Sequence, residues 1–100
     1  MKMKVFYKSE VIEFIERLDY PNRTRLERVR KLFEDYGFQI GPKYVKKVTS
    51  SGIWELRAGN VRLLICFKGD RGFGVHIIFK KTQKLPLRDI KLAERRAKEI

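Results

Sequence analysis

Three stretches in the second half of the sequence alternate in the manner of β-strands, and they constrain the fold more than any other feature. They cover residues 53–57, 61–68 and 74–80. Gly59 and Asn60 separate the first two and suit a two-residue hairpin turn, whereas a glycine-rich loop over residues 69–73 separates the last two. The pattern predicts an antiparallel meander of three strands.

Strand alternation then assigns these residues to two faces of the sheet. The first turn places Arg57 opposite Arg62, and the longer loop places Arg62 opposite Lys80. One face carries no charge and is expected to be the core on which the helices pack. It contains Trp54, Leu56, Ala58, Val61, Leu63, Ile65, Phe67, Val75, Ile77 and Phe79.

The opposite face gathers Arg57, Arg62 and Lys80 side by side across three strands. Like charges directly opposite one another destabilise a sheet, so an anion is expected to offset their repulsion. Glu55, diagonal to Arg62, neutralises part of the charge. A phosphate would neutralise more and matches the guanidinium fork. The alternative is that these long side chains simply extend into water.

Helical segments flank the meander in the sequence. Apolar residues at helical spacing predict two helices that begin at Ser9 and Pro21 and form a hairpin, and a third that begins near Pro86. A short strand over residues 4–7 precedes the hairpin. The expected fold is α+β in the order βααβββα, with an antiparallel sheet at its centre. A length of 100 residues fits one domain over residues 1–100.

The net charge of +12 is unevenly distributed along the chain. Residues 41–88 hold eleven Lys or Arg against only two acidic residues, Glu55 and Asp70. Net charge determines which polyions a protein attracts more than how it folds, so this segment is where an acidic partner is expected. Nucleic acid is the leading candidate, and a solvated basic surface is the alternative.

Several functional classes lack their usual signals. The chain contains one histidine, His76, and one cysteine, Cys66, so we expect neither a two-histidine ribonuclease site nor a metal site. We interpret both as strand residues that contribute to packing. Phosphate-binding loops, hydrolase elbows and zinc-protease motifs are missing from the sequence, and we expect no cofactor. The longest apolar run, residues 63–67, is too short to span a membrane, and we expect a cytoplasmic protein without a signal peptide.

A phosphate site made of basic residues remains possible. RNA cleavage by the neighbouring 2′-hydroxyl requires that this hydroxyl loses its proton, that the charge on phosphorus is stabilised and that the leaving oxygen gains a proton. Cations contribute to all three requirements. Lys46 and Lys47 form a basic loop beside Tyr44, whose ring could stack on a base.

Four short segments occur in a characteristic order. They are Lys46-Lys47, Trp54-Glu55-Leu56-Arg57, Val61-Arg62 and the run KKTQKLP from Lys80 to Pro86. In this order and spacing they resemble the phage-associated HigB branch of the RelE/ParE toxin superfamily. The resemblance implies a toxin of a type II toxin–antitoxin system, a metal-independent endoribonuclease that cuts mRNA on the ribosome. It also implies contacts with ribosomal RNA and a helix-turn-helix, HigA-like antitoxin as partner.

The resemblance assigns roles to individual residues. Arg62 matches the arginine that RelE-like toxins place against the scissile phosphate, and Lys80 or Lys81 matches the basic residue at the end of the following strand. Arg57 adds to the same surface, and Gln83 either contacts a base edge or caps the last helix. Further contacts with RNA are expected from Lys46, Lys47, Tyr44, Lys84 and Arg88.

The sequence departs from RelE at the strand that carries Glu55. RelE has lysines where this chain has Ile53 and Glu55, and the last helix lacks the tyrosine that stacks on a base in RelE. Glu55 is therefore either a general base or a partner that positions Arg57 and Arg62, and we favour positioning.

Two other functions are compatible with the same fold. ParE-like toxins poison DNA gyrase by binding it, without nuclease chemistry, and an inactive relative would retain only RNA or antitoxin binding. The cations Arg57, Arg62 and Lys80 favour the nuclease, because a gyrase inhibitor has no stated need of a phosphate cradle.

Overall fold

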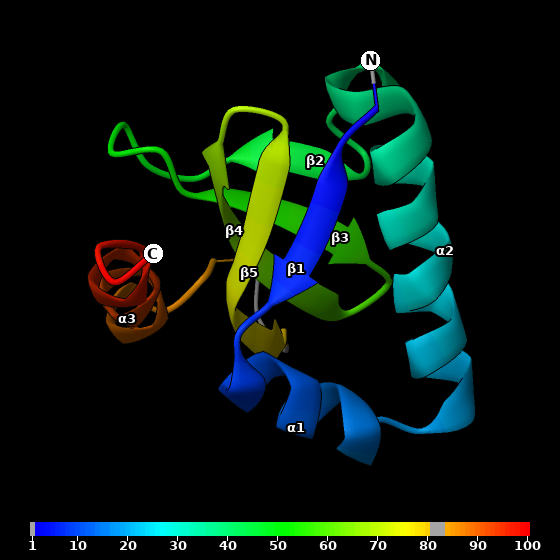
Figure 1. Cartoon of the computed structure of the whole chain (residues 1–100). Coiled ribbons are helices and arrows are strands. Elements are labelled where there is room, and N and C mark those ends of the chain that lie inside the picture. The colour runs from blue at the N-terminus through cyan, green and yellow to red at the C-terminus, as the bar shows by residue number, and fades with distance from the viewer. Residues whose placement is uncertain (1, 81–83) are drawn as a thin grey trace.

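A five-stranded sheet forms the centre of the molecule, with helices on both of its faces (Figure 1). The computed structural model describes residues 2–80 and 84–100. The elements are β1 (Lys4–Tyr7), α1 (Ser9–Arg17), α2 (Tyr20–Tyr36), the 3-10 helix η1 (Gly37–Ile40), β2 (Val45–Lys47), β3 (Trp54–Ala58), β4 (Val61–Lys68), β5 (Arg71–Phe79) and α3 (Leu87–Ala97). The predicted α+β class and the three helices are confirmed. None of the described helices is long and apolar enough to cross a membrane.

The strand order is β1-β5-β4-β3-β2, and β1 pairs in parallel with β5 whereas the other pairs are antiparallel. The sheet therefore contains one strand more than predicted. This strand, β2, pairs Lys46 with Glu55 and was expected to be a basic loop. Only Val45 among its three residues is buried, and so short a segment gives no detectable alternation.

The predicted register of the first hairpin is confirmed, whereas the predicted turn and register of the second hairpin are wrong. Arg57 pairs with Arg62, as the turn at Gly59 requires. The second turn is the tight pair 69–70 rather than a loop over 69–73, and a register shift between Leu64 and Ile65 follows. Arg62 therefore pairs with Ile78 instead of Lys80.

Two glycines inside β5 explain why this register was mistaken. A Cβ on Gly72 would lie 2.8 Å from the Ile65 side chain, and one on Gly74 would lie 2.9 Å from Leu63. These glycines are strand positions over which neighbouring side chains pack closely, a use of glycine that looks like a loop in the sequence.

The first face of the sheet, beneath α1 and α2, carries the larger core. Phe33 and Leu26 from α2 and Val11 from α1 are fully buried against the strands. The prediction that the uncharged face is the core is therefore confirmed for α1 and α2. Within this cluster Phe33, Phe38, Trp54 and Phe67 form a chain of aromatic contacts.

The second face of the sheet carries apolar residues as well as cations, because α3 covers its middle (Figure 1). Ile53, Leu64, Cys66, Val75 and Ala93 form a second buried cluster there. The expectation that the helices pack on one face is thus wrong for α3. Val75 was assigned to the other face, and the register shift moves it under this helix.

Polar contacts fasten α3 to the sheet. Nε2 of His76 lies 2.7 Å from Oδ1 of Asp89, and Nη1 of Arg96 donates to the carbonyl of Val75 at 2.9 Å. Lys8 forms an ion pair with Glu99 at 2.6 Å. His76 is therefore a partly buried strand residue that holds a helix in place.

Replacing His76 with alanine is expected to lower the free energy of unfolding by about 1–2 kcal/mol, because Asp89 loses its partner at a part-buried site. Urea denaturation measures the change, and hydrogen exchange should show faster exchange in α3 than in α2. An Arg95→Ala variant on the exposed side of α3 serves as the control. Equal stability of the two variants would show that the His76 contact does not hold the helix.

Candidate nucleic-acid interface

The part of the second face that α3 leaves open contains a cavity of about 440 Å³ beside the first turns of α3. We call it the cationic pocket. It is lined by Lys46, Lys47, Val48, Glu55, Arg57, Lys80, Lys84, Leu85 and Ile90. Five of these are cations and one is a carboxylate, so the pocket is complementary to an anion. Among residues 2–80 and 84–100, no cluster of three or more His, Cys, Asp or Glu could hold a metal ion.

Glu55, the second residue of β3, occupies the centre of this arrangement. Its Oε1 lies 3.5 Å from Nε of Arg57, and its Oε2 lies 3.9 Å from Nε of Arg62. The predicted diagonal relation to Arg62 is therefore confirmed. The side chain is 6% exposed, and its Oε2 accepts no hydrogen bond from any described residue. Nε of Arg62 likewise forms no hydrogen bond, so these two buried groups compensate each other by charge rather than by a hydrogen bond.

The two arginines of the pair have different environments. The Arg62 guanidinium turns back to the β3–β4 turn, where Nη1 donates to the carbonyls of Gly59 and Val61. It is not among the residues that line the cationic pocket. Burial, together with the nearby Arg57 cation, lowers the pKa of Arg62, and Glu55 acts in the opposite direction.

Arg57 is the arginine that borders the pocket. Its side chain is 32% exposed, and Nη1 lies 3.4 Å from the Pro42 carbonyl, a long and weak contact. The guanidinium therefore stays available to a ligand.

The remaining predicted residues divide into two groups. Lys80 does not pair with Arg62, but its backbone N–H donates to Asn60 at 2.6 Å, and this places its side chain at the pocket. Lys46, Lys47 and Lys84 line the same cavity.

The other predicted residues lie elsewhere. Tyr44 packs against the first core, with Nζ of Lys43 at 5.5 Å from its ring centre. Arg88 is exposed on the first turn of α3. Lys81 and Gln83 lie outside the described residues.

Sequence reasoning missed the apolar wall of the pocket. Val48, Leu85 and Ile90 line it and come from the segment after β2 and from the start of α3. The helix that carries Ile90 was predicted from apolar residues at helical spacing, but this spacing did not show that the helix crosses the cationic face. The wall narrows the pocket on the side of α3.

The chain is similar to known proteins in sequence and in fold. A family model described as a phage-derived, Gp49-like protein matches residues 13–98. One chain of the archaeal RelE–RelB complex from Pyrococcus horikoshii OT3 superposes with a TM-score of 0.63 at 16% identity, covering 77% of this chain and 93% of that one. At this identity the likeness concerns the fold. The sequence matches no curated protein.

Proposed function

The chain belongs to the phage-derived Gp49-like family and has a RelE-like fold, and we propose that it is a toxin of a toxin–antitoxin system and acts as a ribosome-dependent mRNA endonuclease. In this proposal it arrests translation in the cytoplasm and requires no metal. Its partner is an antitoxin, as RelB accompanies RelE in the similar complex, and we expect a helix-turn-helix protein of the HigA type.

One observation carries the proposal: a carboxylate, that of Glu55, lies among the cations that line the pocket. Cations alone would suit any phosphate, including that of DNA. A carboxylate additionally accepts a hydrogen bond, and the 2′-hydroxyl next to a phosphate is a donor that RNA has and DNA lacks. Arg57, Lys46 and Lys80 would bind the phosphate while Glu55 faces the hydroxyl.

The reaction that fits this arrangement is an internal transfer at phosphorus. The 2′-hydroxyl gives its proton to Glu55, the 2′-oxygen forms a bond to the phosphorus, and the bond from phosphorus to the 5′-oxygen breaks. A lysine of the pocket, Lys46 or Lys80, returns a proton to the departing 5′-oxygen. Arg57 stabilises the charge that develops on the phosphate oxygens. The products are a 2′,3′-cyclic phosphate and a 5′-hydroxyl.

Arg57→Gln is expected to reduce mRNA cleavage by about 100-fold to 1,000-fold, because the pocket loses its exposed guanidinium. Primer extension on a message from cells that express the wild type should show cuts at defined codon positions, and these should disappear in the variant. Purified protein should cut the same message only when ribosomes are added.

The matched control is Arg28→Gln, which removes an exposed arginine from α2 and should leave the cuts unchanged. Growth arrest with intact mRNA and double-strand breaks that depend on gyrase would instead select the ParE-like function. Absence of both effects for the wild type would identify an inactive relative.

A further inference from the structure

A second group of cations lies at the far end of the same sheet face. Lys4 on β1 pairs with Arg71 on β5, and Arg71 pairs with Lys68 on β4. We call these three residues the sheet-end row. All three are exposed. Lys4 and Arg71 form no ion pair with a described side-chain carboxylate, and Lys68 donates to an oxygen of Ile100 at 2.8 Å. Like charges directly opposite each other destabilise a sheet, so the row is expected to have an anionic partner.

Two aromatic rings lie next to the row, two residues further along their strands. Phe6 and Phe73 pair across β1 and β5 and stack with ring centres 5.7 Å apart and an angle of 24° between the planes. Phe6 is 40% exposed. An exposed ring held by a second ring is a platform on which a nucleic-acid base can stack.

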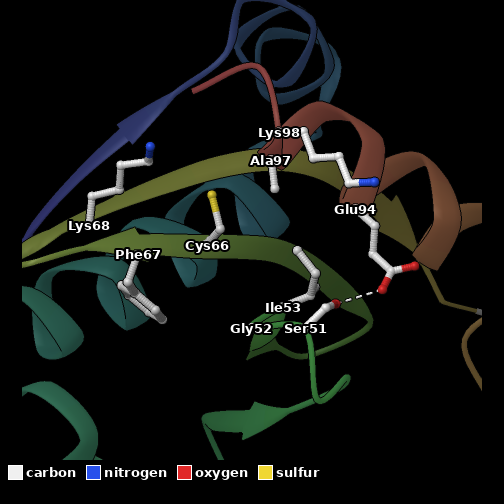
Figure 2. Close-up of a pocket in the computed structure, with 9 residues that line it drawn as sticks. All are labelled: Ser51, Gly52, Ile53, Cys66, Phe67, Lys68, Glu94, Ala97 and Lys98. Atoms are coloured by element: carbon white, nitrogen blue, oxygen red, sulfur yellow. Dashed lines mark hydrogen bonds between the residues drawn. The ribbon is translucent and has the colours of Figure 1, made fainter.

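A cavity of about 420 Å³ adjoins the row, between the end of β4, the loop before β3 and the second half of α3 (Figure 2). Lys68 and Lys98 stand at this cavity with Cys66 between them (Figure 2). Ser51 donates a hydrogen bond to Glu94 at 2.6 Å, which engages the carboxylate that lines the cavity. Lys68 is held in position by the carbonyl of Ile100 at 2.8 Å.

The outer side of α3 connects this cavity to the cationic pocket. The exposed cations of the helix and its cap are Arg88, Lys91, Arg95 and Lys98, at a spacing that places them on one side. The acidic residues of the same segment are engaged by other elements: Asp89 by His76, Glu94 by Ser51 and Glu99 by Lys8. The carboxylates keep their charge, but the four cations of the stripe outnumber the three carboxylates.

We propose that the sheet-end row, with Phe6 and Lys98, is a second RNA-binding site that holds the same single strand that enters the cationic pocket. The inference rests on the proposed nuclease function. Along β5, Arg71 of the row and Lys80 at the cationic pocket are nine residues apart, which is about 30 Å at the rise of a β-strand. The stripe on α3 gives the phosphates of the strand a continuous series of cations between the two sites.

RNA fits this surface better than an acidic protein segment does. Phosphates match the row, and bases match the ring platform, whereas an acidic peptide would use only the cations. Lys4 also borders a cavity that contains Glu34, Asp35 and Asp70, and these carboxylates weaken the attraction of any polyanion along that edge. Lys68 and Arg71, which lie closer to α3, are accordingly the stronger contacts.

The test compares a labelled single-stranded RNA of about 12 nucleotides with one of about 4, by fluorescence anisotropy at several salt concentrations. The combined variant Lys4→Gln/Lys68→Gln/Arg71→Gln should bind the longer RNA about tenfold more weakly. Its slope of log K against log salt should fall by about 2 in magnitude, because three charges are removed. Phe6→Ala should weaken the longer RNA about fivefold and leave this slope unchanged. Binding of the shorter RNA should not change.

Two further variants make the outcomes distinguishable. Arg17→Gln/Arg28→Gln/Lys31→Gln removes the same charge from exposed positions on α1 and α2 and should have little effect. Arg57→Gln should weaken both RNAs, and its failure to do so would overturn the proposed function. Equal loss in the two triple variants would overturn the second site. The second RNA-binding site would also be overturned if the combined Lys4→Gln/Lys68→Gln/Arg71→Gln variant lost binding to a polyglutamate peptide but still bound RNA normally, since this result would identify a protein-binding surface.

Discussion

Replacing Arg62 with alanine is expected to lower the free energy of unfolding by about 3 kcal/mol and to abolish growth arrest and mRNA cleavage. The guanidinium donates to two carbonyls of the β3–β4 turn and faces Glu55, whose Oε2 accepts no hydrogen bond from the described chain. Its removal leaves those carbonyls without this donor and leaves the buried Glu55 carboxylate with Arg57 alone beside it, and breaking a buried pair on one side costs more than the pair contributes. Urea denaturation followed by circular dichroism measures the loss.

The comparison variant is Arg57→Ala, which removes a neighbouring arginine that is one-third exposed. Its stability should change by less than about 1 kcal/mol, because an ion pair at such a position is screened by water. Its cleavage should nevertheless be lost. If Arg62→Ala were as stable as the wild type yet inactive, Arg62 would act on the phosphate directly, and the role we give it in holding the turn and Glu55 would be wrong.

Glu55→Gln should reduce the rate of cleavage by about 100-fold or more while RNA binds at least as tightly as to the wild type. The amide keeps the shape of the side chain but does not take up a proton at neutral pH, which removes a general base. It also removes the one negative charge that lines the cationic pocket, so a phosphate is attracted more strongly. Single-turnover cleavage on ribosomes and anisotropy with uncleavable 2′-deoxy RNA measure the two effects separately.

Glu99→Gln is the matched control for this substitution. It removes the same charge from an exposed ion pair with Lys8 and should leave both the rate and the affinity unchanged. A Glu55→Gln variant with weaker RNA binding and a nearly normal rate would show that the carboxylate only positions Arg57 and Arg62. The sequence favours that positioning role, and the place of Glu55 among the cations that line the pocket is the reason that we propose proton transfer instead.

The parts of the fold that the sequence predicted correctly depend on local signals. Alternation over β3 and β4 and the turn at Gly59 determine the register of the first hairpin, since a two-residue turn leaves no freedom in pairing. The second hairpin failed because Gly72, which the prediction assigned to the loop, serves tertiary packing inside β5 and not chain reversal. The face covered by α3 was not predictable either, because an amphipathic helix shows that it buries a stripe but not against which surface.

The candidate site shows the same division between local and tertiary information. Strand alternation by itself predicts that Glu55, Arg57 and Arg62 share one face, and their proximity is confirmed. Which of the two arginines borders the cationic pocket was not predictable, because this depends on the carbonyls of Gly59 and Val61 that accept hydrogen bonds from Arg62. Lys80 reaches the pocket although its predicted strand pairing was wrong, because the end of β5 lies beside the same turn.

The parallel pairing of β1 has a consequence for how the chain matures during synthesis. The sheet partner of β1 is β5, which emerges from the ribosome only after most of the chain has been made. Closing the long loop between β1 and β5 is slow, and β1 stays unpaired until β5 has been synthesised. The cationic pocket also needs residues from β2 through α3. A nascent chain therefore has neither a closed core nor a complete pocket until β5 and α3 have been made.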